Sequence, residues 1–230
     1  MTVPEALQDP KLRRYRLRRH RLHCAGGELS VVAPARADDL LEGDAGAECL
    51  RRRQMPYWAE IWPASVALAR HLMRGPSLSG VRVMDLGCGI GTPGLAAARR
   101  GARVHFVDLD PEALHFAAFN TRTISAERVS FEQLDWFEAT VDGQFDQILL
   151  ADVAYEVRNF EPLRRHLRSC LTEGGHGLLS DPYREATDAF LDWLQPEYRG
   201  NMSATDTFFD GTRIAVRMAT LSQAEEGVTP

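Results

Sequence analysis

From residue 63 onward, short apolar runs alternate with longer stretches in which apolar residues return every three or four positions. The short runs have the length and composition of β-strands, and the longer stretches have the spacing of amphipathic helices. Strands are predicted over 81–86, 102–109, 128–134, 144–151 and 174–181. Helices are predicted over 63–74, 92–100, 111–123, 157–171 and 185–194.

The order of these elements predicts the fold class. Strands that alternate with helices form parallel sheets, and a nearly all-apolar strand such as 144–151 has both faces covered. Near the C-terminus, Asp210-Gly211 separates the strand-like runs 204–209 and 212–221, which predicts an antiparallel hairpin. We therefore expect an α/β protein with a Rossmann-like, mostly parallel seven-stranded sheet, helices on both faces and a C-terminal antiparallel hairpin.

The chain divides into three parts on the same pattern. Residues 1–54 form an N-terminal extension with an arginine-rich segment, a candidate hairpin and, over 38–48, a polar loop or a short helix. Such a basic segment either contacts an acidic partner or forms a solvated edge of the fold. Residues 55–221 form the main domain, and residues 222–230 are expected to be a disordered tail.

Composition and charge argue against several kinds of partner. The net charge of −5 argues against general nucleic-acid binding. No apolar run has the ~18 residues needed to span a bilayer, and the N-terminus lacks the apolar segment of a secretory signal. The four cysteines lie far apart, without the spacing of a metal or redox motif. This favours reduced thiols and a cytoplasmic location.

The most informative segment, VMDLGCGIGTPG, runs from a predicted strand through Gly87, Gly89 and Gly91 into a predicted helix. Glycines at such a turn let the backbone bend tightly and approach a ligand closely. Dinucleotide-binding loops share this design, but their G-x-G-x-x-G spacing requires a glycine where this chain has Thr92. The spacing therefore argues against a dinucleotide.

The acid two residues before the first glycine adds a second distinction. Asp85 is unsuited to a pyrophosphate but suited to a ligand that carries an ammonium group. The pattern D-x-G-x-G-x-G resembles motif I of the class I S-adenosylmethionine-dependent methyltransferases. The resemblance implies S-adenosylmethionine as the cofactor, held by Asp85, Gly87, Gly89 and Gly91.

Two further strand ends carry residues suited to the same ligand. Asp108 ends a strand about twenty residues after the loop, where a carboxylate accepts hydrogen bonds from both ribose hydroxyls. Asp135 follows the next strand and is a candidate acceptor for the adenine amino group, with Trp136 or its neighbours packed on the ring. A position in the hydrophobic core is the alternative for Trp136. We predict that Asp108, Asp135 and Trp136 bind the cofactor.

Two other segments make the resemblance more specific. MPYWAEIWPASVALARHL, residues 55–72, precedes the first long helix, and Asp-Val-Ala-Tyr, from Asp152 to Tyr155, follows the fourth strand. With the glycine loop they resemble methyltransferase family 16, which includes lysine methyltransferases of electron-transfer flavoprotein β-subunit and of chaperones, and nicotinamide N-methylase-like proteins. The resemblance covers roughly residues 55–200. It implies that Trp62 shapes the cofactor pocket and that Asp152 and Tyr155 line the opening for the substrate amine.

This arrangement predicts an N-methyltransferase, most simply one that acts on a lysine of a protein substrate. A lysine amine must first lose a proton, which costs roughly 4 kcal/mol near pH 7.4 for a pKa of ~10.4. A carboxylate stabilises the ammonium form, so we expect Asp152 to capture and orient the amine rather than to act as a strong base. The Tyr155 hydroxyl is then available to the amine, and its ring to the alkyl stem.

Alternatives on the same scaffold are a small-molecule N-methyltransferase and a non-enzymatic module that binds the cofactor. Enzymes that methylate nucleic-acid bases usually carry Asn/Asp-Pro-Pro-aromatic at the position of Asp152, and this chain lacks those prolines. Metal-dependent O-methyltransferases need a cluster of acids, and the sequence shows none with clear ligand spacing. We therefore expect neither a nucleic-acid substrate nor a metal.

Overall fold

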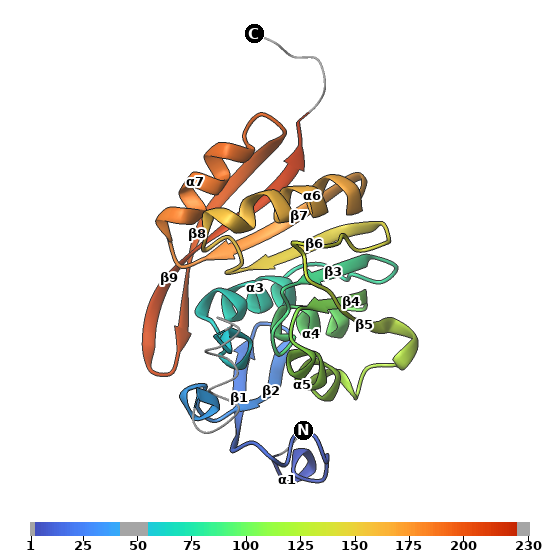
Figure 1. Cartoon of the computed structure of the whole chain (residues 1–230), viewed down its shortest axis with the longest axis vertical. Helices are drawn as coiled ribbons and strands as arrows, with labels where there is room; N and C mark the ends of the chain where they lie inside the picture. The colour runs from blue at the N-terminus through green and yellow to red at the C-terminus, as the bar shows by residue number, and fades with distance from the viewer. Residues whose placement is uncertain (1–2, 42–54, 225–230) are drawn as a thin grey trace.

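A seven-stranded sheet forms the centre of the computed structural model, which describes residues 3–41 and 55–224 (Figure 1). Its strands are β3 (Arg82–Leu86), β4 (Arg103–Asp108), β5 (Val129–Gln133), β6 (Phe145–Ala151), β7 (Leu171–Asp181), β8 (Tyr198–Phe209) and β9 (Thr212–Gln223). They lie in the order β5-β4-β3-β6-β7-β9-β8. β3 to β7 pair in parallel, and β9 pairs antiparallel with both β7 and β8. The predicted fold class is confirmed.

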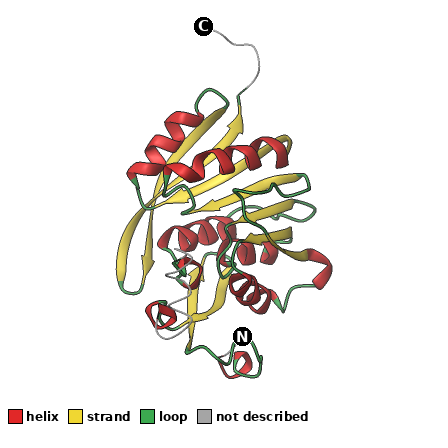
Figure 2. Ribbon diagram, viewed as in Figure 1, coloured by secondary structure: helices red, strands yellow, loops and turns green. Residues whose placement is uncertain are grey.

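Helices cover both faces of this sheet, and Figure 2 shows them on either side of the strands. The α-helices are α1 (Val3–Ala6), α3 (Pro63–Arg74), α4 (Thr92–Arg99), α5 (Pro111–Thr121), α6 (Phe160–Cys170) and α7 (Glu185–Leu194). Single 3-10 turns are η1 (Asp38–Leu41), η2 (Tyr57–Ala59), η3 (Ala126–Arg128) and η4 (Val157–Asn159). In the described part of the chain, no helix combines the length and apolar character needed to cross a membrane.

Strand β6 shows how one sequence pattern builds both layers. Its residues Ile148, Leu149 and Leu150 are all fully buried. Successive side chains of a strand point to opposite faces. Ile148 and Leu150 therefore join the hydrophobic cluster of α6 and α7, and Leu149 joins that of α3, α4 and α5. The unbroken apolar run from Ile148 to Ala151 in the second half of this strand follows from its cover on both sides.

The N-terminal segment forms a hairpin of β1 (Leu17–Cys24) and β2 (Gly27–Pro34), paired antiparallel. Its apolar residues Leu22, Leu29 and Val31 are buried in the cluster of α3, α4 and α5. Asn120 of α5 binds the backbone of Val32 twice, as acceptor at 2.9 Å and as donor at 3.0 Å. The described N-terminal residues thus share the core of the main domain, and the boundary proposed at residue 54 stays a prediction.

The C-terminal hairpin is longer than the sequence indicated. β8 begins at Tyr198 rather than at 204, and β9 continues through Ser222 and Gln223, which the sequence assigned to the tail. Residues 225–230 of the predicted tail, and most of the polar loop predicted over 38–48, lie outside the described residues. The helix predicted from 157 begins at Phe160 after a 3-10 turn. Pro162 therefore lies in its first turn, where a missing N–H has little cost.

Candidate active site

The glycine loop joins β3 to α4 at the carboxyl ends of the parallel strands. Gly87, Gly89 and Gly91 have φ values of 67°, 52° and 82°, a left-handed backbone that residues with a Cβ seldom adopt. Gly91 is the N-cap residue of α4. The three predicted glycines are therefore required by the backbone conformation of the loop.

Close neighbours enclose the same loop. A Cβ on Gly87 would lie 2.9 Å from the Val153 side chain and 3.0 Å from the Trp136 ring. A Cβ on Gly89 would lie 3.3 Å from the carbonyl oxygen of Trp58. The loop thus lies between a backbone segment before α3 and the turns that follow β5 and β6. Trp136 is partly exposed and packs at the edge of the core, and its contact with the adenine ring stays a prediction.

Asp108 is held in place by the loop itself. Its Oδ2 accepts the Gly89 N–H at 2.8 Å, and its Oδ1 accepts the Asp110 N–H at 2.9 Å. Each carboxylate oxygen has a second lone pair, so Asp108 can still accept bonds from a ligand. The neighbouring acid Asp135 accepts the Phe137 N–H at 2.8 Å and lies partly exposed beside the end of β4.

Asp85 lies beneath the loop and is 1% exposed. Its Oδ2 accepts the N–H of Gly94 in the first turn of α4 at 2.8 Å. Loss of solvent raises the pKa of Asp85 to about 8, and the nearby Asp108 charge adds to the rise. Asp85 therefore holds the loop to the helix. A cation bound above it would favour its charged form, while direct contact with a ligand ammonium stays a prediction.

This burial predicts that the cofactor-free protein loses stability as the pH rises from 7.0 to 8.5. The folded-state pKa of Asp85, about 8, exceeds the unfolded value of about 3.9, so the folded state keeps a proton that the unfolded state has lost. The expected loss is about 1 kcal/mol, or about 2–4 °C in melting temperature. Calorimetry at the two pH values measures it.

The variant Asp85→Asn keeps an acceptor for Gly94 and should lose most of this dependence. Desolvation lowers the pKa values of His20, His71, His166 and His176, so these side chains titrate below pH 6.5. Burial raises the pKa of the Cys88 thiol, which affects stability only above about pH 8.5. An unchanged slope in Asp85→Asn would show that another group carries the effect.

The second half of the site surrounds Asp152, directly after β6. Its backbone is left-handed, with a φ of 57°, and its N–H donates to the Ser180 carbonyl of β7 at 2.8 Å. Its carboxylate accepts two bonds from Arg184, 2.6 Å from Nε and 2.9 Å from Nη2. The carboxylate that the sequence assigned to the substrate amine is thus paired with a guanidinium that the sequence analysis did not identify.

Aromatic side chains form one side of this region. The rings of Tyr57 and Tyr155 have centroids 6.0 Å apart, and those of Tyr57 and Trp62 are 6.1 Å apart. Trp62 fixes the cluster because its indole N–H donates to the Tyr57 carbonyl at 2.9 Å. The structure thus places Trp62 beside Tyr57 and Arg184, whose guanidinium lies 5.8 Å from its ring centroid. Its predicted role in the cofactor pocket stays a prediction.

Tyr155 remains a neutral phenol in this setting. Burial raises its pKa, and the charge of Glu156 adds to the rise. Asn159, buried at 1% exposure, donates to the Val153 carbonyl at 2.9 Å and so fixes the turn between Asp152 and Tyr155. Because Val153 also contacts Gly87, this turn lies directly against the glycine loop. The two halves of the site are therefore contiguous.

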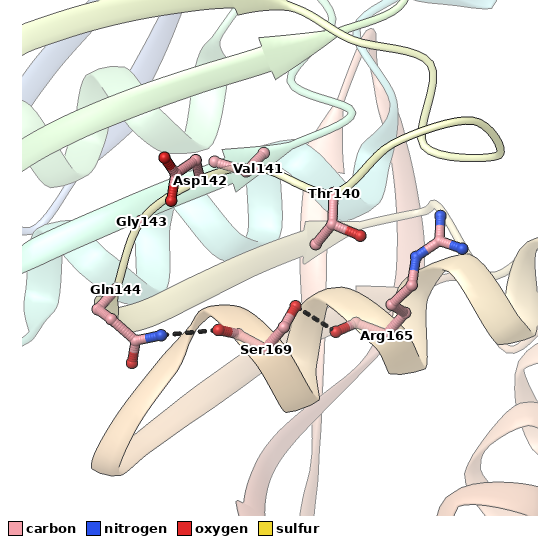
Figure 3. Close-up of a pocket in the computed structure, with 7 residues that line it drawn as sticks. All are labelled: Thr140, Val141, Asp142, Gly143, Gln144, Arg165 and Ser169. Atoms are coloured by element: carbon pink, nitrogen blue, oxygen red, sulfur yellow. Dashed lines mark hydrogen bonds between the residues drawn. The ribbon is translucent and has the colours of Figure 1, made fainter.

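A separate depression of about 500 Å³ lies near the amino end of β6, on the opposite side of the sheet from the strand ends that carry the site (Figure 3). It is lined by the connection before β6 and by the end of α6, at Thr140, Val141, Asp142, Gly143, Gln144, Arg165 and Ser169. These residues lie at the amino end of β6, whereas Asp152 follows its carboxyl end. The depression is therefore not part of the candidate active site.

The strand order, the glycine loop after β3 and the acid that ends β4 together define the class I S-adenosylmethionine-dependent methyltransferases. The family model described as "Methyltransferase domain" matches residues 77–222. The chain belongs to this family, and its cofactor is S-adenosylmethionine.

Individual relatives agree with this assignment. The chain is 34% identical to the protein N-lysine methyltransferase METTL21A of Danio rerio, over 67% of this chain and 73% of that protein. It is 36% identical to the electron transfer flavoprotein beta subunit lysine methyltransferase of Danio rerio, over 56% of this chain. That match spans about half of the relative's length, 51%. The N-methyltransferase NodS of Bradyrhizobium japonicum, solved with S-adenosyl-L-homocysteine, has the same fold at 17% identity. Its TM-score is 0.58, with 80% of this chain and 96% of that chain covered.

The residues present fit this cofactor. The left-handed glycines leave the loop backbone open to a ligand, and Trp58 and Trp136 lie on either side of it. Asp108 supplies negative charge for a ligand that carries a sulfonium and an ammonium, and such a cation would favour the charged form of Asp85. Asp108 also retains acceptor capacity for a ribose. These individual contacts, and those of Asp135 with adenine, remain predictions.

Proposed function

We propose that this chain methylates the side-chain amine of a lysine in a protein substrate. The proposal depends mainly on one observation: the turn from Asp152 to Tyr155 lies against Gly87 and is flanked by Tyr57 and Trp62. A carboxylate and aromatic faces together suit an alkylammonium group, through charge and cation–π attraction. The relatives named as lysine methyltransferases support the same substrate class.

Each of these residues has a distinct part in the proposed reaction. S-adenosylmethionine supplies an electrophilic methyl group when it is bound. Asp152 draws in and orients the cationic amine. The aromatic side chains cover the alkyl stem and desolvate the ammonium, which lowers its pKa and favours release of its proton to solvent before the attack. The Tyr155 hydroxyl oxygen accepts an amine N–H, which leaves the nitrogen lone pair free to attack. Attack on the methyl carbon would break its bond to sulfur and release S-adenosyl-L-homocysteine.

The surface around this turn supports a macromolecular substrate. Large apolar side chains that are usually buried are exposed here: Tyr57 at 48%, Phe137 at 44%, Val157 at 70% and Tyr183 at 48%. Exposed apolar side chains gathered around a site are typical of a protein-binding surface. A small substrate would not require such a rim.

The experiment is incubation of the enzyme and radiolabelled S-adenosylmethionine with lysate from a strain that lacks the gene. We expect a labelled protein band whose label is recovered as methyl-lysine. Asp152→Asn should lower the labelling rate by about 100-fold or more, as expected when a positioning charge is lost. Asp142→Asn is the matched control. Asp142 lines the depression near the amino end of β6, so this variant should retain the wild-type rate.

The alternatives predict other results in the same experiment. Label confined to small molecules would identify a small-molecule N-methyltransferase. Cofactor binding without any label transfer would identify a non-enzymatic module. Either result would contradict the proposal.

We also propose a cytoplasmic location, with neither nucleic acid nor membrane as a partner. Cys24, Cys88 and Cys170 are free thiols, as expected in a reducing compartment. The net charge of −5 disfavours a polyanionic partner.

A further inference from the structure

Arg184 covers the carboxylate that the proposed reaction requires. The Asp152 side chain is only 3% exposed, whereas that of Arg184 is 37% exposed. The two bonds of 2.6 and 2.9 Å engage both carboxylate oxygens. A substrate amine that approaches from solvent therefore meets the guanidinium before it meets Asp152.

The surroundings of this guanidinium have the features of a binding site for an organic cation. A buried carboxylate lies on one side, and the Trp62 ring centroid lies 5.8 Å away. The other acid close to Arg184 is Asp181. Its carboxylate accepts two bonds from Arg217, at 2.8 and 3.1 Å, and is not paired with the Arg184 guanidinium. Asp152 is therefore the direct ion-pair partner of the guanidinium, and the charge of Asp181 adds a weaker attraction.

The backbone beside Arg184 is fixed while its side chain extends from it. The Arg184 N–H donates to Asp181 at 2.7 Å, and the preceding Tyr183 has a left-handed φ of 59°. Among the described non-glycine residues, only Asp152, Tyr183 and Asp210 have a positive φ. Asp152 belongs to the Asp152–Arg184 pair and Tyr183 directly precedes Arg184, and such backbone strain is often concentrated at functional sites. A long side chain on an anchored backbone can rotate away without unfolding the turn.

We propose that the Arg184 guanidinium occupies the position of the acceptor's cationic group, and that an acceptor must displace it from Asp152 to enter. The inference rests on the proposed function only for the identity of that acceptor as a lysine. An incoming ammonium replaces one cation with another, so the buried carboxylate is never left unpaired. A neutral or anionic side chain would leave it unpaired, and this cost selects for a cationic acceptor.

The test uses n-butylammonium, which has the length and charge of a lysine side chain, and the full chain without cofactor. Thermal unfolding is followed as the amine concentration increases. Arg184→Ala should be less stable than the wild type, because its Asp152 charge lacks a partner. Added n-butylammonium should stabilise this variant at a concentration at least tenfold lower than any that affects the wild type. The uncharged analogue of equal length, 1-butanol, should have no such effect.

Three further variants make the result specific. The double variant Arg184→Ala with Asp152→Asn should lose the response to n-butylammonium, because the carboxylate is gone. Arg184→Lys keeps a cation on a flexible stem and should respond as weakly as the wild type. Arg18→Ala removes a two-bond pair with Asp210 at the exposed surface and should show no response.

Equal stabilisation of the wild type and Arg184→Ala would overturn the proposal, as would a response of Arg18→Ala or no response of Arg184→Ala. None of these measurements depends on methyl transfer. A positive result together with unlabelled lysate proteins would leave the cation site established and reject the lysine substrate. A negative result together with labelled lysate proteins would reject the cation site and support the lysine substrate.

Discussion

Replacement of Gly94 with alanine should destabilise the protein by at least about 2 kcal/mol and lower its melting temperature by about 4–8 °C. The new Cβ would lie 2.2 Å from the Phe106 ring and 2.7 Å from the Asp85 carboxylate. Both neighbours are buried, at 0% and 1% exposure, so neither can move into open space. The measurement is calorimetric unfolding of the cofactor-free protein.

The sign of this effect separates packing from helix propensity. Gly94 lies in α4, and alanine in a helix interior is normally about 0.8–1.0 kcal/mol more favourable than glycine. Overpacking of a filled core costs about 1–3 kcal/mol or more, and contacts this short belong at the upper end. The cost of overpacking should therefore exceed the gain in helix propensity, and Gly94→Ala should be less stable than the wild type.

Gly200→Ala is the matched control. The nearest side-chain atom to its new Cβ would be 3.8 Å away, on Leu221, which is an ordinary contact. Its melting temperature should stay close to that of the wild type. An unchanged or higher melting temperature for Gly94→Ala would show that α4 can shift, and that the Asp85–Gly94 contact does not fix the loop.

The parts of the fold predicted from sequence are those with a strong hydrophobic pattern. Strand β6 was predicted because Ile148, Leu149 and Leu150 are buried on both faces. Strand β8 lies at the edge of the sheet, and its first half is mostly exposed. Because exposed positions need no apolar residue, the run from Tyr198 carries no alternation that would reveal a strand.

The candidate site also contains residues that a sequence pattern reveals and residues that it does not. Asp85, Asp108 and Asp152 were identifiable because each acid ends or follows an apolar strand at the rim where parallel strands end. Gly94 was identifiable in principle, since a glycine inside a helix usually has a packing reason. Arg184 had no comparable signal. It lies 32 residues after Asp152 in the chain, and the pairing of β6 with β7 brings the two together.

Loss of the Asp108 carboxylate should weaken cofactor binding by about 10- to 150-fold for each ribose bond removed, since one charge-assisted hydrogen bond contributes about 1.5–3 kcal/mol. Asp108→Ala also leaves the N–H groups of Gly89 and Asp110 without the acceptors that they have at 2.8 and 2.9 Å. The glycine loop then loses a contact that orders it. Isothermal titration calorimetry with S-adenosylmethionine measures the affinity.

The neighbouring acid provides the control for this prediction. Asp110 caps α5 by accepting the Glu112 N–H at 2.8 Å, so Asp110→Ala should cost about 1 kcal/mol of stability. Its cofactor affinity should stay near that of the wild type, because the ribose role is assigned to Asp108 alone. An affinity loss of equal size in both variants would instead indicate a disordered loop.

The pH dependence separates a direct ribose contact from a purely structural role. Desolvation raises the pKa of Asp108 to about 6, so the carboxyl is charged at pH 7.5 and largely protonated at pH 5. A charged carboxylate accepts two ribose hydroxyls, whereas the neutral acid is a weaker acceptor. The difference in affinity between the wild type and Asp108→Ala should therefore shrink as the pH falls through 6. Because only this difference is compared, the titration of groups distant from Asp108 largely cancels. A difference that stays constant from pH 7.5 to 5 would mean that Asp108 supports the loop without contacting the ribose.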